Sequence, residues 1–465
     1  MDGIVREALQ GLSGIVGDKL LSDQATLAKR PTKEQLVKLL KSSPPDQGRP
    51  LEDVVKEFED ILSYRFNVNH PRFYAFVPSA ASPISWLGDV ISTAFNNYAG
   101  SSESGSGICA VEESIIRWVA EKFGLPPSAG GQFVSGASLA CLTALTVARD
   151  QLVEDDMRTK ATAYVTEETH FCIAKALRIT GLSKNQIRTV PCNAEFQMDP
   201  GSLRRAITQD IENGLKPYVV ITTCGSTNTG SIDPLDAIAD IAAEHRMWMH
   251  VDAAYGGSVA FCQSRRNLLQ GIGRADSIAY PHKWLFQTYG CSVVLFKDKS
   301  HPRESFATTA HFLRDVEDGY VENPFNFGIE LTRPARHMRL WFSLQILGTD
   351  MIDRMILRGF ELSDLVQTEL SKLREWETVT PSNMAVINFR FNPPGKSAEA
   401  IDEINSLVSQ RMAAQNIAVV LTTRIRGVVC LRMCTINSQT TDDDIRDIID
   451  ALDRNVRLVS KGIID

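Results

Sequence analysis

Short apolar segments alternate with helical segments between about residues 110 and 300, and this alternation is the strongest constraint on the fold. Five segments have the length and aliphatic content of buried strands: 132–135, 161–166, 218–223, 247–252 and 292–296. Helices are expected between them, for example over 139–150 and 234–245. Apolar strands joined by helices are typical of a mostly parallel sheet with helices on both faces. The sequence therefore predicts an α/β fold.

The regions on either side of this core have different patterns. The N-terminal region contains helical segments and proline-rich loops, and its apolar stripe over 51–66 requires a partner surface. Beyond residue 350, a helix predicted over 350–373 is followed by strand-like segments and a last helix over 441–458, which together predict a small α+β unit. We therefore expect three units: an N-terminal helical arm (1–72), a large domain (73–350) and a small C-terminal domain (351–465).

The composition excludes several classes of protein. The 465 residues carry a formal net charge of −7, whereas a broad nucleic-acid-binding surface needs an excess of Lys and Arg. The sequence has no apolar run of about 18 residues and no signal-peptide pattern, so we expect a cytoplasmic protein with no membrane partner. Its nine cysteines include no CxxC pair, and there is no HExxH motif. Reduced thiols and no metal site are therefore expected.

Small or polar residues follow three of the predicted strands, and a fourth polar residue of interest, a lysine, comes further along the chain. The turn Ser135-Gly-Ala-Ser138 leads directly into a helix, where backbone N–H groups and a hydroxyl group can hold an anion. His170 follows the strand over 161–166, Asp252 ends another strand, and Lys283 comes 31 residues later. Ligands of open parallel sheets bind at the carboxyl ends of strands, so we expect these residues to lie close together.

Each of these features alone has an ordinary structural explanation, such as a helix corner or a paired buried carboxylate. Together they match the requirements of one ligand. Pyridoxal phosphate needs a lysine for a Schiff base, a carboxylate for its pyridinium nitrogen and a loop for its phosphate. The combination predicts a pyridoxal-phosphate enzyme.

Five ordered blocks resemble the group II pyridoxal-phosphate-dependent amino-acid decarboxylases, the family of aromatic L-amino acid decarboxylases and aromatic aldehyde synthases. These blocks are residues 70–78, 135–138, 224–233, 250–257 and 275–284. The resemblance extends from about residue 50 to the C-terminus. It implies a type I aminotransferase-like fold and an intertwined homodimer, with the active site at the subunit interface and the N-terminal helices packed on the partner.

The resemblance also implies a role for each matching residue. Lys283 would bind the cofactor covalently, Asp252 would pair with its ring nitrogen, and His170 would stack on the ring. The other positions implied are Ala254 beneath the ring, Ala137 and Ser138 at the phosphate, Thr227 beside the ring, and His282 near the phosphate and the active-site base. Arg333 matches a family arginine whose role the resemblance leaves open.

Tyr280 and Phe312 are two of the positions that depart from the family pattern. Tyr280 stands where many relatives have an Asn or Asp that contacts the phosphate, and its phenol can donate one hydrogen bond. Phe312 stands where relatives have a loop tyrosine that protonates the carbanion left by loss of CO₂, and phenylalanine has no proton to give. In relatives similar to plant aromatic aldehyde synthases, this change accompanies O₂-dependent oxidative deamination. We therefore predict decarboxylation of an L-amino acid, aromatic by default, coupled to formation of an aldehyde, NH₃ and H₂O₂.

Three alternatives are compatible with the same residues. A simple decarboxylase would release an amine if His311 or His282 supplied the proton. An aminotransferase or another lyase on this fold would use a carboxylate-binding arginine, for which Arg390 and Arg432 are candidates. A non-catalytic homologue retained for assembly is disfavoured because Lys283 is intact.

Overall fold

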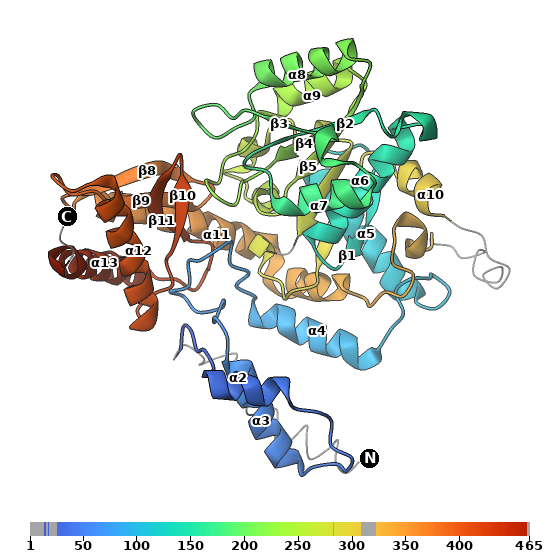
Figure 1. The fold of residues 1–465 in the computed structure, drawn as a ribbon. Helices are drawn as coiled ribbons and strands as arrows, with labels where there is room; N and C mark the ends of the chain where they lie inside the picture. The colour runs from blue at the N-terminus through green and yellow to red at the C-terminus, as the bar shows by residue number, and fades with distance from the viewer. Residues whose placement is uncertain (1–13, 15–16, 18–25, 282, 308–321, 463–465) are drawn as a thin grey trace.

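The computed structural model describes residues 14, 17, 26–281, 283–307 and 322–462. Figure 1 shows a large α/β body and a smaller lobe formed by the C-terminal part of the chain. The N-terminal helices α2 (Lys33–Leu40) and α3 (Leu51–Ser63) project from this body beyond α4 (Pro83–Phe95). Within the described ranges, no helix combines the length and the apolar character that crossing a bilayer requires.

A seven-stranded sheet forms the centre of the large body, in the order β1-β7-β6-β5-β4-β2-β3. Its strands are β1 (Gly130–Val134), β2 (Ala161–Thr166), β3 (Ile187–Val190), β4 (Lys216–Thr223), β5 (Trp248–Asp252), β6 (Ser277–Pro281) and β7 (Ser292–Phe296). Neighbouring strands are parallel from β6 through β5, β4 and β2 to β3. Only β7 runs antiparallel to its neighbours, β1 and β6. The predicted mostly parallel sheet is confirmed.

Helices cover both faces of this sheet. On one face, α6 (Ala137–Leu152) and α7 (Phe171–Ile179) pack against the strands. The opposite face is covered by α5 (Ser106–Lys122), α8 (Pro200–Glu212), α9 (Leu235–Glu244) and the first part of α11 (His337–Ser371). Every residue of β2 and β5 is buried. This double coverage explains why both strands are uninterrupted apolar segments in the sequence.

Two strands of the central sheet and one helix boundary differ from the sequence-based expectation. The apolar pattern does not predict β3, which has four mostly half-exposed residues, or β6, which contains Ser277 and ends at Pro281. The long helix α11 begins at His337 rather than near residue 350. It is interrupted at Gly348, whose φ of 70° and ψ of 165° break the helical geometry. That glycine interrupts the apolar period, so the sequence pattern predicts a helix start after it.

The C-terminal lobe contains a four-stranded antiparallel sheet in the order β10-β11-β9-β8. Its elements after α11 are β8 (Trp376–Asn383), β9 (Val386–Phe391), α12 (Ala398–Ala414), β10 (Leu421–Ile425), β11 (Val428–Cys434) and α13 (Asp442–Gly462). Leu362 of α11, Val408 of α12 and Leu452 of α13 share one buried core with the strands. The prediction of a small α+β unit is confirmed.

A buried ion pair connects β1 to the segments that border it. Arg333 is 2% exposed and donates hydrogen bonds to both carboxylate oxygens of Glu112, at 2.5 and 3.0 Å. It also donates to the carbonyl oxygens of Ala99 and Phe133. Burial raises the pKa of Glu112, but Arg333 and His337 outweigh it, so that the pKa of this carboxyl lies below its usual value. Arg333 therefore holds β1 in place.

We predict that Arg333→Met lowers the free energy of unfolding by about 3–5 kcal/mol, because Glu112 loses its buried cation. The matched control is Arg117→Met on α5, which removes an exposed pair with Glu113 at 2.8 Å and should cost less than about 1 kcal/mol. Denaturant unfolding followed by circular dichroism measures both changes. Equal losses in the two variants would contradict a structural role for the buried pair.

Candidate active site

The predicted site residues come together at one edge of the central sheet. Because β1 and β6 are both antiparallel to β7, β1 runs in the same direction as the parallel strands. The turn after β1, His170 after β2, Asp252 at the end of β5 and Lys283 after β6 therefore lie at the same edge. Both Asp252 and Lys283 are close enough to His170 to change the pKa of its ring.

Asp252 is a buried carboxylate with few partners. It is 4% exposed, and one of its oxygens accepts the N–H of Ala254 at 3.0 Å. Among the described residues, no side chain donates a hydrogen bond to it. Burial raises the pKa of Asp252, and the positive charges of Lys283 and His170 only partly oppose this effect. A buried carboxylate in this state fits a cationic partner such as a protonated ring nitrogen.

Lys283 begins a short 3-10 turn, Lys283–Leu285, and its side chain is half-buried. The next residue, Trp284, is fully buried and anchors this turn. Its ring stacks on Tyr255 at a centroid distance of 5.3 Å and also contacts Phe360 at 5.2 Å. No ion-pair partner of Lys283 is found among the described residues. The preceding residue, His282, lies outside the described residues.

His170 caps the N-terminus of α7. Its Nδ1 atom accepts the backbone N–H of Cys172 at 3.3 Å, so the proton of the neutral ring lies on Nε2. The ring is half-buried. The Cys172 thiol raises the pKa of His170, and this effect exceeds the opposing effect of burial. The cap therefore fixes the orientation of the ring at the edge of the site.

The turn after β1 has the features of an anion-binding loop. Gly136 is the N-cap of the 16-residue helix α6, and no side chain caps this end. A Cβ atom on Gly136 would meet no atom within 4 Å, so the space around it is open. The N–H groups of Ala137 and Ser138 open the helix, where such groups lack intrahelical partners. This turn fits the phosphate of the expected cofactor.

The turn after β4 connects the large body to the C-terminal lobe. Thr227 is exposed on this turn. The backbone carbonyl of its neighbour Asn228 accepts hydrogen bonds from Asn388 at 3.1 Å and from Arg432 at 3.3 Å. Arg432 also donates to the carbonyl of Phe76 at 2.6 Å. The C-terminal lobe thus fixes two loops of the large body, including the loop that carries Thr227.

Tyr280 does not take the position expected for it. Its hydroxyl is hydrogen bonded to Ser258 at 3.2 Å, and its ring packs against Phe123 and Phe261. These contacts lie in the core on the face of the sheet opposite α6. The Tyr280 ring therefore lies on the face of the sheet opposite α6, whose first residues are the expected phosphate site. Phe312 lies outside the described residues.

Sequence reasoning missed two features beside His170. Glu168 has one buried carboxylate oxygen without a hydrogen-bond partner, and burial raises its pKa. The sulfur atoms of Cys141 and Cys172 lie within 4.8 Å of each other and of an oxygen of Asp252. Glu168 lies two residues before His170 and is visible in the sequence. The two cysteines are 31 positions apart and meet only through the packing of α6 on α7.

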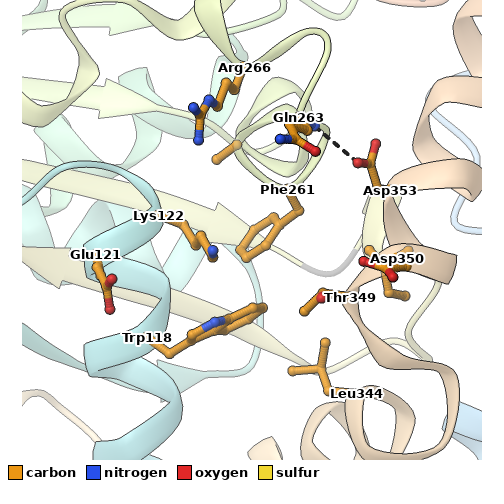
Figure 2. A pocket seen from close by; sticks show the side chains of 12 residues that line it. Trp118, Glu121, Lys122, Phe261, Gln263, Arg266, Leu344, Thr349, Asp350 and Asp353 are labelled. Carbon is orange, nitrogen blue, oxygen red and sulfur yellow. Dashed lines mark hydrogen bonds between the residues drawn. The ribbon is translucent and has the colours of Figure 1, made fainter.

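A separate cavity of about 340 Å³ lies away from these residues. Figure 2 shows that Trp118 and Phe261 form one wall and that Asp350 and Asp353, near the interruption of α11, lie across from them. The two aromatic rings are 4.9 Å apart between centroids. None of the strand-end residues described above lines this cavity, so it is distinct from the candidate site.

Proteins that are similar in sequence and fold identify the family of this chain. Residues 33–392 match the family model described as the pyridoxal-dependent decarboxylase conserved domain. The chain is 33% identical over 417 residues to an aromatic-L-amino-acid decarboxylase of Bacillus atrophaeus, covering 89% of this chain and 86% of the relative. It is 30% identical over 372 residues to a phenylacetaldehyde synthase of Petunia hybrida, covering 77% and 74%. TDC of Oryza sativa, crystallised with PLP and tryptamine, superimposes with a TM-score of 0.93 at 26% identity, covering 98% of each chain.

The fold and the family match define the class of protein as a pyridoxal-phosphate enzyme. More specifically, the chain belongs to the pyridoxal-dependent decarboxylase family, and its cofactor is pyridoxal phosphate. Its relatives include both aromatic amino-acid decarboxylases and aldehyde synthases. Family membership therefore establishes a decarboxylase and is compatible with either an amine or an aldehyde product.

Proposed function

We propose that this protein decarboxylates an aromatic L-amino acid and couples this step to oxidative deamination. One amino acid, one O₂ and one H₂O would give the aldehyde, CO₂, NH₃ and H₂O₂. The observation that carries the decarboxylase assignment is the arrangement of Lys283, Asp252 and His170 at one edge of the sheet. The oxidative step is argued from Phe312.

We propose a role for each site residue that is compatible with its surroundings. Pyridoxal phosphate, when bound, withdraws electrons from the carbon atom that loses CO₂. Lys283 provides the amine that attaches the cofactor. Asp252 keeps the ring nitrogen protonated, because a buried carboxylate is stabilised by an adjacent cation. His170 would cover one face of the bound ring, and Ala254, whose N–H donates to Asp252, would lie beneath the other face.

The remaining proposed contacts surround the phosphate and the ring edge. Ala137 and Ser138 bind the phosphate through the first N–H groups of α6, supported by the Ser138 hydroxyl group. Thr227 lies beside the ring on a turn that the C-terminal lobe holds in place. His282 is proposed to act near the phosphate and the active-site base, from its place in the sequence next to Lys283.

The proposed oxidation depends on a missing proton donor. A carbanion that is protonated at once gives an amine, whereas one that persists can react with O₂. Phe312 has no acidic proton, so it cannot perform the protonation that a loop tyrosine performs. The similarity to a phenylacetaldehyde synthase supports this route. We propose that His170, at the edge of the site, assists transfer of protons to the peroxide.

The amine-releasing decarboxylase is the second candidate, favoured by the similarity to the enzyme of Bacillus atrophaeus. An aminotransferase is less well supported, because the arginines that could bind a second carboxylate have other partners. Arg390 forms ion pairs with Glu377 at 3.8 Å and Asp402 at 3.5 Å. Arg432 donates to backbone carbonyl groups of the two loops described above.

We also propose a homodimer with the active site at the subunit interface. Helices α2 and α3 have no buried residues, although both are amphipathic. On α3, Phe58 is 58% exposed and Leu62 50%, and on α4, Ile91 is 49% exposed and Phe95 74%. Exposed apolar faces on consecutive helices are typical of an interface. A second copy of the chain would cover them, as the sequence led us to expect.

For the cofactor assignment, we predict that Lys283→Ala abolishes the visible absorbance band of lysine-bound pyridoxal phosphate and reduces decarboxylation below detection, because the attaching amine is lost. Lys297→Ala, on an exposed lysine just after β7, is the matched control and should retain both. Absorbance spectroscopy of the purified proteins tests this. A persistent band in Lys283→Ala would overturn the assignment.

For the product, we predict that Phe312→Tyr raises the amine-to-aldehyde ratio about tenfold or more, since a positioned general acid typically contributes 10²–10⁴-fold. An oxygen electrode with peroxide detection, run with a panel of aromatic amino acids, measures the change. Phe306→Tyr, at the last residue of α10 (Ser300–Phe306), should leave the ratio as it is. Amine formation without peroxide in the unmodified protein would end the oxidative proposal and leave the decarboxylase assignment standing.

For the assembly, we predict that Phe58→Lys combined with Ile91→Lys converts a dimer into a monomer with little activity, because two charges would enter the proposed interface. Leu458→Lys on α13, where the leucine is 61% exposed, should leave the dimer intact. Analytical ultracentrifugation and activity assays measure the effect. A monomeric unmodified protein with full activity would contradict the proposal.

A further inference from the structure

The two cysteines beside Asp252 form a pair that the proposed chemistry does not use. The sulfur atoms of Cys141, on α6, and Cys172, on α7, lie within 4.8 Å of each other. Both residues are buried, with exposed fractions of 0% and 4%. We propose that these two thiols form a reversible disulfide bond when the protein meets hydrogen peroxide, and that this bond weakens cofactor binding at the adjoining edge of the site.

The surroundings of the two thiols make their reactivity unequal. The Cys141 thiol and the His170 ring lower the pKa of Cys172, even though burial opposes this effect. The pKa of Cys141 is raised by its contact with Cys172 and by burial. A thiolate is the species that reacts with peroxide. Cys172 is therefore the attacking residue, and Cys141 is the thiol that resolves the product.

The reaction balances with hydrogen peroxide as the only oxidant. The Cys172 thiolate attacks one peroxide oxygen, which breaks the O–O bond, forms a sulfenic acid and releases hydroxide. The Cys141 sulfur then attacks the Cys172 sulfur, which forms the S–S bond and releases the second oxygen as water after proton transfer. Two thiols are oxidised and one peroxide is reduced. A disulfide requires the sulfurs to approach to about 2.05 Å, so at least one cysteine side chain must rotate.

A metal site is a poorer interpretation of the same atoms. Two sulfurs and one carboxylate oxygen lie close enough to share an ion. A structural zinc site, however, takes four ligands in almost all cases, and we have assigned the Asp252 carboxylate to the cofactor ring. The disulfide accounts for both sulfurs and leaves Asp252 in that role.

The position of Cys172 connects its oxidation to the site. Its backbone N–H holds Nδ1 of His170 at 3.3 Å, directly before α7 begins. Drawing Cys172 toward α6 shifts this cap and the ring that it orients. The Cys172 side chain also lies beside Asp252, so the bond changes the packing around that carboxylate. This functional consequence rests on the proposed roles of His170 and Asp252, whereas formation of the disulfide does not.

To test this, the cofactor-loaded full-length protein is treated with stoichiometric amounts of hydrogen peroxide. Peptide mapping under non-reducing conditions should find Cys141 linked to Cys172, with the loss of two hydrogen atoms, and a thiol reductant should reverse the link. Retention of pyridoxal phosphate after gel filtration should fall several-fold on oxidation and recover on reduction. The peptide map gives its result even if the protein has no oxidative activity of its own, so it separates this inference from the proposed function.

Variants of the two cysteines make the test specific. Cys141→Ala should prevent the link and leave a sulfenic acid on Cys172 that a dimedone probe traps, and Cys172→Ala should prevent both. Cys291→Ala, at another buried cysteine, should form the link as the unmodified protein does. Oxidation of Cys172 without a link in the unmodified protein would overturn the disulfide. Unchanged cofactor retention in the linked protein would overturn its effect on the site, and so would equal peroxide-induced loss of cofactor in Cys141→Ala.

Discussion

The buried carboxylate of Asp252 is the group on which the arrangement of the site depends. A charged group enclosed at the end of a central strand is unfavourable unless positive charge compensates it. Here one backbone N–H contacts the carboxylate, and Lys283 and His170 only partly offset its burial. The carboxylate therefore favours a cationic ligand. A protonated pyridine nitrogen would meet this need, and the open, uncapped turn at Gly136 offers N–H groups for the phosphate of the same cofactor.

The rest of the fold keeps the groups around Asp252 at one edge of the sheet. Parallel strands bring the ends of β2, β4, β5 and β6 together, and the two antiparallel pairings of β7 restore the same direction for β1. Arg333 and Glu112 fix β1 from one side. The C-terminal lobe fixes the turn after β4 through Arg432. Local turns supply the functional groups, and long-range contacts hold those turns in position.

The sequence predicts the sheet and its strand-end residues because both follow local rules. Continuous apolar segments indicate buried strands, and a polar residue such as Asp252 at the end of one is conspicuous. The short edge strand β3 lacks such a signal because most of its residues are half-exposed and do not form an apolar segment. The start of α11 is hidden because Gly348 interrupts the apolar period of the helix. The orientation of Tyr280 into the core follows from packing against Phe123 and Ser258. No local pattern specifies which face of the sheet such a ring occupies.

The Cys141–Cys172 pair shows the same limit of sequence reasoning and links two parts of the chemistry. No spacing rule pairs cysteines on separate helices, and only the packing of α6 on α7 brings their sulfurs together. A site that releases hydrogen peroxide exposes nearby thiols to it first, and an isolated thiolate can be oxidised beyond repair. A second thiol close by instead reacts with the sulfenic acid to form a disulfide, which reductants can reduce. The proposed loss of a proton donor at Phe312 and the presence of a resolving thiol at Cys141 are therefore chemically consistent: the first creates the oxidant, and the second makes its effect on the adjoining residues reversible.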